Sequence, residues 1–139
     1  MFGEEHDSDS LIRTILGVNE ADDSLVLAGE IKQGGFLKLM HASTDSLING
    51  AETAARSTAQ MQGSMVTAGQ GLAVLVSCVG RKLVMGERVG DEIAAVSAVL
   101  GYETTLAGYY SFGEICPFAP GSGCELHNQT MTITHLVET

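Results

Sequence analysis

The chain has 139 residues, 45% of them hydrophobic, and a formal net charge of −10 at pH 7. This length and composition suit one globular domain with a hydrophobic core of its own. The seven lysine and arginine residues form no cluster, which excludes a nucleic-acid-binding surface and a surface for anionic lipid. We therefore expect a single domain over residues 1–139, with neither nucleic acid nor membrane as a partner.

Nothing in the sequence indicates export or membrane insertion. Residues 1–9 are acidic and lack the basic and apolar regions of a signal peptide. The longest apolar runs, such as 71–80, are far shorter than the roughly 20 residues that a membrane-spanning helix needs. Three cysteines, an odd number, do not make a disulfide framework. We expect a cytoplasmic protein with reduced thiols.

The first third of the chain predicts β-strands. Residues 11–16 form an apolar run, and a segment rich in Asn, Asp and Gly at 17–23 separates it from a second run at 25–31. This order is typical of a hairpin with a longer loop. After two glycines, residues 36–40 alternate between apolar and other side chains, as a third strand should.

A long helix is expected next. Ser43 or Thr44 is a suitable N-cap, and Asp45 would favour the positive end of the helix dipole. Gly63 is a suitable residue to end the helix. One face of the helix is rich in alanine, which permits close approach to a sheet. This face consists of Leu47, Ala51, Ala54, Ala55, Thr58 and Gln62.

The second half of the chain alternates strands and helices. Residues 71–76 are continuously apolar, which predicts a strand buried on both faces. Residues 77–81 lead into a short helical segment that ends near Gly86, and a further helix is expected over 91–100. Its inward-facing residues are Ile93, Val96, Val99 and Leu100. Two final strands, at about 105–114 and 129–137, flank a loop that contains Pro117 and Pro120.

The order of these elements predicts the fold class. Strands that resemble hairpins at both ends of the chain favour an α+β domain over a regular βαβ repeat. We expect a mainly antiparallel or mixed sheet of about six strands, packed against roughly two or three helices.

Two runs near the end of the chain place polar side chains among residues that are typical of buried strands. Gly108–Ile115 carries two phenols and a carboxylate, and Glu125–Thr130 carries an imidazole and amides. Burying a polar group without a partner costs about 1–3 kcal/mol. These side chains must therefore bond either to one another or to a ligand.

Together with two earlier segments, these runs resemble the successive motifs of the FIST C-terminal domain. The earlier segments are Ser77–Arg81 and the run from Leu39 and Met40 into a helix that begins at Asp45. The resemblance covers essentially the whole chain in the right order. It implies a sensory domain of a signal-transduction protein that binds a small ligand, such as an amino acid or another small carboxylate, and we expect no catalytic activity.

The resemblance also implies partners and one possible cofactor. The partners would be a FIST N-terminal domain or a signalling protein such as a kinase or chemoreceptor, and a homo-oligomer is compatible with the sequence. Some family members are reported to bind haem and sense nitric oxide, and eukaryotic relatives occur in F-box adaptor proteins. We nevertheless expect no cofactor here.

One departure from the family concerns the start of the chain. No FIST N-terminal domain precedes the resembling region, and Met1 lies just before its first strand. We expect either a fragment or a short stand-alone version of the protein. A binding site between the two domains would then be incomplete in this chain.

A ligand site is expected where the strand at 71–76 leads into the next helix. Free N–H groups at a helix N-terminus and the guanidinium of Arg81 suit a carboxylate. Glu114 would accept the ammonium of an amino acid, and His127 and Asn128 would hold its remaining polar groups. Neighbouring tyrosines of one strand point to opposite faces, so one of the pair at 109–110 can line a pocket. The candidate ligand-binding residues are Cys78, Arg81, Tyr109, Ser111, Glu114, His127 and Asn128.

The same residues allow other interpretations. Arg81 and Glu114 could form a structural ion pair while His127 and Asn128 shape a loop, which would suit a structural or protein-interaction module, as in adaptor proteins. Cys78, at a helix N-terminus beside Arg81, could have a lowered pKa and act as a nucleophile with His127 as its base. A buried structural cysteine is the commoner case.

Metal and haem binding have weaker support in the sequence. Cys116, Cys124 and His127 give a C-x7-C-x2-H pattern in a loop rich in Gly and Pro. Structural zinc sites usually contain a close cysteine pair and a fourth ligand. Haem needs an axial His, Cys or Tyr in an apolar pocket, and no spacing selects one among His41, His127 and His135.

Overall fold

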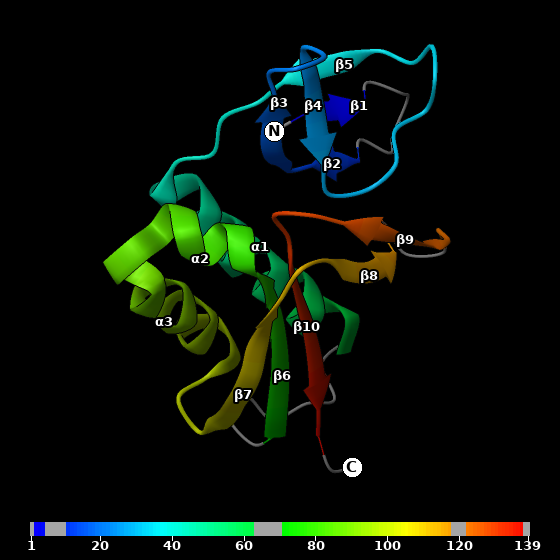
Figure 1. Cartoon of the computed structure of the whole chain (residues 1–139). Helices are drawn as coiled ribbons and strands as arrows, with labels where there is room; N and C mark the ends of the chain where they lie inside the picture. Colours follow the sequence, from blue (N-terminus) through cyan, green and yellow to red (C-terminus); the bar gives the residue numbers. More distant parts are fainter. Residues whose placement is uncertain (1, 5–10, 63–70, 118–121, 138–139) are drawn as a thin grey trace.

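The computed structural model describes residues 2–4, 11–62, 71–117 and 122–137 (Figure 1). The strands are β1 (Phe2–Glu4), β2 (Ile12–Arg13), β3 (Ile15–Asn19), β4 (Ser24–Leu27), β5 (Leu37–Leu39), β6 (Gly71–Cys78), β7 (Thr104–Ser111), β8 (Glu114–Pro117), β9 (Cys124–His127) and β10 (Met131–Leu136). The helices are α1 (Thr44–Gln62), α2 (Val79–Met85), the 3₁₀ turn η2 (Gly86–Arg88) and α3 (Val89–Leu100). The predicted α+β class is confirmed. The described strands form four small sheets instead of one sheet of six.

The sheet that carries the core has the strand order β10-β6-β7 (Figure 1). β6 runs antiparallel to β10 and parallel to β7, which it reaches through α2, η2 and α3. Ser77 of β6 is therefore the neighbour of both Tyr110 on β7 and Met131 on β10. The carboxyl ends of the two parallel strands lie side by side, where open α/β sheets commonly bind ligands.

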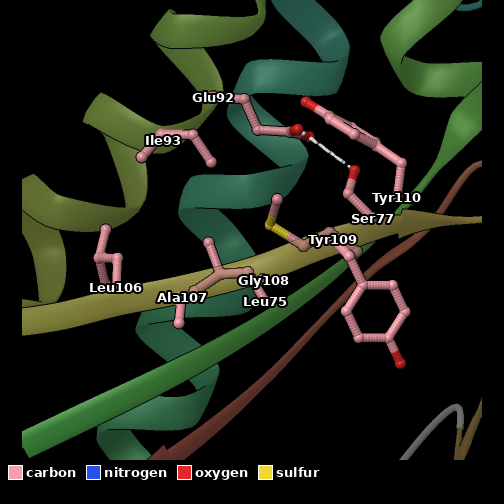
Figure 2. Close-up of a pocket in the computed structure, with 10 residues that line it drawn as sticks. Leu75, Ser77, Glu92, Ile93, Leu106, Ala107, Gly108, Tyr109 and Tyr110 are labelled. Atoms are coloured by element: carbon pink, nitrogen blue, oxygen red, sulfur yellow. Dashed lines mark hydrogen bonds between the residues drawn. The ribbon is translucent and has the colours of Figure 1, made fainter.

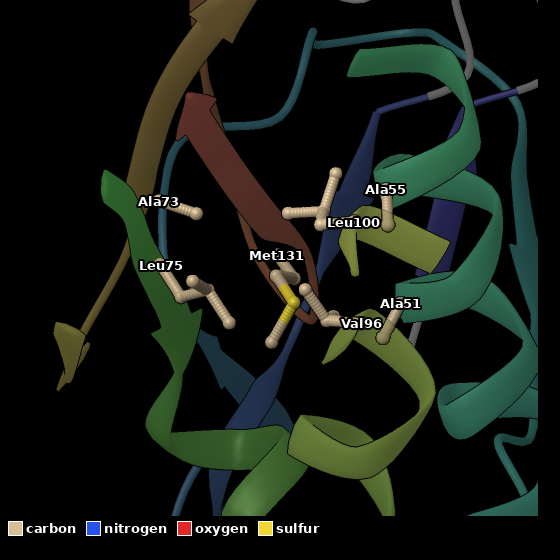
Figure 3. Close-up of a cluster of buried hydrophobic side chains, with 7 residues drawn as sticks. All are labelled: Ala51, Ala55, Ala73, Leu75, Val96, Leu100 and Met131. Carbon is tan, nitrogen blue, oxygen red and sulfur yellow. The ribbon is translucent and has the colours of Figure 1, made fainter. Parts of the chain in front are cut away.

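Two helices, α1 and α3, cover one face of this sheet and enclose the hydrophobic core (Figure 3). The core consists of Ala51, Ala55, Ala73, Leu75, Val96, Leu100 and Met131. The predicted alanine-rich face is confirmed by Ala51 and Ala55, which are fully buried and bring α1 close to its neighbours. Ser43 caps this helix, because its Oγ accepts the N–H of Ser46 over 3.2 Å. The proposed stop at Gly63 lies outside the described residues.

The second face of the β10-β6-β7 sheet is open in the described part of the chain. Ala73 and Leu75 are buried, but Leu72 is 37% exposed, Tyr109 64% and Leu136 55%. The prediction that residues 71–76 are buried on both faces is therefore wrong, because helices cover a single face. A parallel strand pair is usually covered on both faces, so the open face is an unusual feature.

The N-terminal strands form two further sheets, β2-β1-β5 and β3-β4. The predicted strand at 11–16 is interrupted at Thr14, whose N–H donates to Asn128 Oδ1 over 3.3 Å. The predicted turn at 17–23 begins later, because β3 continues to Asn19 with a register shift near Gly17. Among the helices of the described ranges, none is both long enough and apolar enough to cross a membrane.

The predicted strand at 105–114 is divided into β7 and β8. The division falls at Gly113, where an added Cβ would lie 2.8 Å from Leu126 Cδ1. Because Leu126 Cδ1 is the end of a flexible and partly exposed side chain, a small shift of Leu126 would make room for this Cβ. The β8–β9 pairing sets Glu114 opposite His127. Pro120, in the predicted loop, lies outside the described residues.

Candidate functional site

A buried ion pair joins α2 to α3 beside the carboxyl end of β6. Arg81 is 3% exposed and Glu92 is fully buried. The Nε of Arg81 donates to Glu92 Oε1 over 2.7 Å, and its Nη2 contacts the same oxygen. Nη2 also donates to the carbonyl oxygen of Leu47 over 2.7 Å, and Nη1 to that of Gln129 over 3.4 Å. The guanidinium thus holds three helices and the β9–β10 connection together, and its charge is compensated inside the protein.

A cavity of about 240 Å³ lies beside this pair, between α3 and β7 (Figure 2). We call it the Glu92 cavity. Its polar lining consists of Ser77, Glu92 and Tyr110, and its apolar lining includes Leu75, Ile93, Leu106 and Met131. Ser77 Oγ donates to Glu92 Oε2 over 3.2 Å. Figure 2 shows the Tyr110 ring next to Glu92, whereas the Tyr109 ring points to the other side of the strand. An apolar cavity with a few polar groups at one end is typical of a small-molecule site.

Burial and two charged side chains, those of Glu92 and Arg81, set the pKa of Tyr110 at the edge of the cavity. Burial raises the pKa of Tyr110, the negative charge of Glu92 raises it further, and Arg81 opposes the rise. Tyr110 therefore stays a neutral phenol that can donate a hydrogen bond. Outside the cavity, the Nζ of the exposed Lys82 lies 5.0 Å from the centroid of the Tyr110 ring.

A second polar cluster surrounds Glu114, which is also buried. Ser111 Oγ donates to its Oε1, and Thr130 Oγ1 donates to its Oε2 over 2.7 Å. Across the strand pair, His127 Nε2 lies 3.1 Å from the carbonyl oxygen of Cys116, so it must carry a hydrogen and donate. These contacts satisfy Glu114 with protein hydroxyls, as a structural carboxylate requires.

The predicted site residues are thus divided between two places. Ser111, Glu114 and His127 are brought together, but Arg81 pairs with Glu92 and the alternative ion pair with Glu114 is not formed. Tyr109 borders the Glu92 cavity on β7.

Two further candidate residues, Cys78 and Asn128, are buried and bonded to the protein backbone. Cys78 is 3% exposed, and its backbone N–H donates to the carbonyl oxygen of Thr130. Asn128 is buried, and its Nδ2 donates to the carbonyl oxygen of His127 while its Oδ1 accepts the N–H of Thr14. Asn128 therefore fastens the N-terminal strands to the β9–β10 connection.

Sequence reasoning missed Glu92 and Ser77. Ile93, which was predicted to face inward from α3, is 40% exposed, whereas Glu92 is fully buried. The positions 92, 96, 99 and 100 follow helical spacing as well as the positions 93, 96, 99 and 100 do. An acid in the first turn of a helix is usually solvated, so Glu92 was not predicted to be among the buried residues of α3.

The described residues give little support to metal or haem binding. They contain no group of three or more His, Cys, Asp or Glu side chains that could hold a metal ion, so Cys116, Cys124 and His127 form no such site. The three histidines considered as axial haem ligands lie in different surroundings. His41 is exposed, His127 directs Nε2 at a carbonyl oxygen, and His135 Nε2 lies against the backbone of Gly71.

Comparison with known proteins gives one result. The family model of the FIST C domain matches residues 1–117 of the 139-residue chain, and no FIST N-terminal domain is matched in it. The match ends before the Glu125–Thr130 run. No curated protein and no solved structure matches the chain. The chain belongs to the FIST C domain family, a sensory domain family of signal-transduction proteins.

Proposed function

We propose that this domain senses a small apolar amino acid by binding it in the Glu92 cavity. The observation that carries the proposal is a fully buried carboxylate at one end of an apolar cavity. Glu92 Oε1 is used by Arg81, whereas Oε2 receives the hydroxyl of Ser77 over 3.2 Å. A carboxylate oxygen accepts about two hydrogen bonds, so Oε2 can also accept a hydrogen bond from the ammonium of a ligand. Because Glu92 is 0% exposed, the neighbouring Tyr110 ring would move aside to let the ammonium reach it.

The rest of the cavity suits the rest of an amino acid. An aliphatic side chain would pack against Leu75, Leu106 and Met131. The ligand carboxylate would face Lys82, whose ammonium lies over the ring of Tyr110 at the border of the cavity. The role that the sequence suggested for Glu114 is thereby assigned to Glu92, and the role suggested for Arg81 to Lys82.

The proposed activity is binding without catalysis. Cys78 is the candidate nucleophile, and it does not line the Glu92 cavity, so a ligand bound there would not contact its sulfur. The three cysteines are free thiols, which favours the reducing cytoplasm as the place of action. No cofactor enters the proposed binding event.

A thermal-shift measurement with amino acids tests the proposal. A ligand at about 100 times its Kd stabilises the folded state by about 2.7 kcal/mol, which raises the melting temperature by several degrees. We expect leucine or valine to give this shift and aspartate to give none. Ile93→Trp should abolish it, because Ile93 lines the cavity and is partly exposed, so a larger side chain can fill the opening.

The matched control is Leu83→Trp. Leu83 is exposed on α2 and does not line the cavity, so this variant should keep the full shift. Equal shifts in the two tryptophan variants would place the binding site elsewhere and refute the proposal.

A second candidate function, protein interaction, is favoured by the open face of the β10-β6-β7 sheet. Leu72, Tyr109 and Leu136 are exposed there on neighbouring strands. The partner we propose is a FIST N-terminal domain, which would connect the sensor to a signalling protein such as a kinase or chemoreceptor.

Size-exclusion chromatography with light scattering tests this interaction on a mixture of the chain and a FIST N-terminal domain. A complex should form and be lost in Tyr109→Lys. It should persist in Tyr102→Lys, because Tyr102 is exposed but lies outside the sheet. A doubled mass for the chain alone that returns to the monomer value in Tyr109→Lys would show that a second copy occupies this face, and would overturn the assignment.

A further inference from the structure

A second cavity, of about 370 Å³, lies at the other edge of the same sheet. We call it the Thr58 cavity. It lies between α1, β10 and the β8–β9 pair, and its lining includes Ser57, Thr58 and Met61 from α1 and His127, Thr130 and Met131. The buried core residue Met131 also lines the Glu92 cavity, so its side chain is a wall shared by the two cavities.

Two hydroxyls of the Thr58 cavity, those of Thr58 and Thr130, have used their hydrogen-bond donors. Thr58 Oγ1 donates to the carbonyl oxygen of Ala54 over 2.9 Å, and Thr130 Oγ1 donates to Glu114 Oε2 over 2.7 Å. A hydroxyl has one donor and two lone pairs, so both groups offer only lone pairs to a ligand. A ligand that bonds to Thr58 or Thr130 must therefore bring the hydrogen-bond donor.

The charge of the lining limits the ligand further. None of the described residues that line this cavity is Asp, Glu, Lys or Arg, and the imidazole of His127 in the lining directs its Nε2 at the carbonyl oxygen of Cys116. A charged ligand would lose its hydration without gaining an ionic partner, which is strongly unfavourable. The remaining lining is largely apolar and includes Ile12, Ala54 and Ile133.

We propose that the Thr58 cavity is a second ligand site, for a neutral molecule with an apolar body and a hydroxyl or amide N–H donor. The site takes a different class of ligand from the Glu92 cavity and does not depend on the function proposed above. Because Met131 lines both cavities, the domain would have two ligand sites that are separated by one core side chain.

Cyclohexanol is a suitable probe, because cavities of about 150 Å³ already hold a benzene ring. The assay is NMR of protein labelled with ¹³C at the methionine methyl groups. Met61 lines only the Thr58 cavity, Met131 lines both cavities, and Met85 is buried and lines neither. Cyclohexanol should move the Met61 and Met131 signals to saturation and leave Met85 unchanged.

Two related probes test the chemistry. Cyclohexanone has the same ring but only accepts hydrogen bonds, so it should bind about tenfold more weakly. Cyclohexylammonium is charged and should not move Met61. If cyclohexylammonium shifts the Met131 signal but not the Met61 signal, it binds in the Glu92 cavity. The two methionine signals therefore show separately whether each cavity binds its probe.

Substitutions on α1 locate the site. Ser57→Trp should abolish the cyclohexanol shifts, whereas Gln60→Trp, on an exposed position outside the lining, should keep them. Thr58→Val keeps the shape but removes the lone pairs, and it should weaken binding about tenfold. The proposal is overturned if the Met61 shift does not saturate, if cyclohexanone binds as well as cyclohexanol, or if both Ser57→Trp and Thr58→Val bind like the wild type.

Discussion

Replacing Glu92 with glutamine should cost far more stability than the same change at Glu52. Each glutamate accepts from an arginine of the same chain, so the two variants remove the same charge from the same kind of pair. Their surroundings differ. The side chains of Arg81 and Glu92 are 4% and 0% exposed, whereas those of Arg56 and Glu52 are 62% and 38% exposed.

The magnitudes follow from this difference in burial. Removing one partner of a buried pair leaves a charge inside the protein and costs about 3–5 kcal/mol. An exposed i,i+4 pair on a helix contributes about 0.3–0.5 kcal/mol. Because Arg81 keeps its bonds to two backbone carbonyls, we expect Glu92→Gln to fall near the lower value, at about 3 kcal/mol.

Urea unfolding followed by circular dichroism measures both free energies. We expect the transition midpoint of Glu92→Gln to fall strongly with an unchanged slope, and that of Glu52→Gln to move little. The single variant Glu92→Leu should also be strongly destabilised, because it leaves the charge of Arg81 buried and unpaired. The double variant Glu92→Leu with Arg81→Met should be more stable than this single variant, because the unpaired charge is removed. A difference below about 1 kcal/mol between the two glutamine variants would mean that water reaches the Arg81–Glu92 pair, and would refute the reasoning.

Three further predictions concern the sheet, the thiols and the buried phenol. Gly108→Ala should destabilise the fold severely in the same urea assay, because an added Cβ would lie 2.1 Å from the carbonyl oxygen of Leu75. Iodoacetamide should label Cys124 faster than Cys116 at mildly alkaline pH, as followed by mass spectrometry, because burial and nearby negative groups raise the pKa of Cys116. Tyr110 should ionise above the ordinary tyrosine pKa in an ultraviolet titration, because burial raises its pKa. The stability that Tyr110 gains from its neutral form is therefore present below about pH 10 and is lost as the pH rises through its folded pKa.

Each of these predictions has a control and a contradicting result. Ala107→Ser changes the residue next to Gly108 on an exposed position and should be nearly neutral, so equal losses in the two variants would contradict the steric argument. Faster labelling of Cys116 than of Cys124 would contradict the raised pKa of the Cys116 thiol. Tyr110→Phe should remove the last phase of the titration, and loss of an earlier phase would contradict the raised pKa.

The helices could be predicted because their signals are local. Ser43, Asp45 and the alanines of α1 lie within a few turns of one another, and cap chemistry and helical spacing identify such an element without knowledge of the tertiary structure. The strand at 71–76 shows the limit of this approach. Its composition predicts burial on both faces, but whether a layer covers each face depends on the whole fold.

The candidate site shows the same division between local and tertiary information. Glu114 and His127 were expected to act together, and they are opposite each other on β8 and β9. The partner of Arg81 was missed, because the choice between Glu92 and Glu114 depends on how α2 turns through η2 into α3. Both acids could pair with Arg81 by charge, and only the tertiary fold selects one.

Calorimetric titration of the unmodified protein with three related ligands tests the central claim most directly. Leucine has an ammonium, a carboxylate and an isobutyl group, whereas isoamylamine lacks the carboxylate and 4-methylpentanoate lacks the ammonium. If Glu92 holds the ammonium inside the cavity and Lys82 only borders it, isoamylamine should bind within about fivefold of leucine, since an exposed ion pair contributes about 0.2–1 kcal/mol. 4-Methylpentanoate should give no heat of binding. Binding of 4-methylpentanoate as tight as that of leucine would contradict the account.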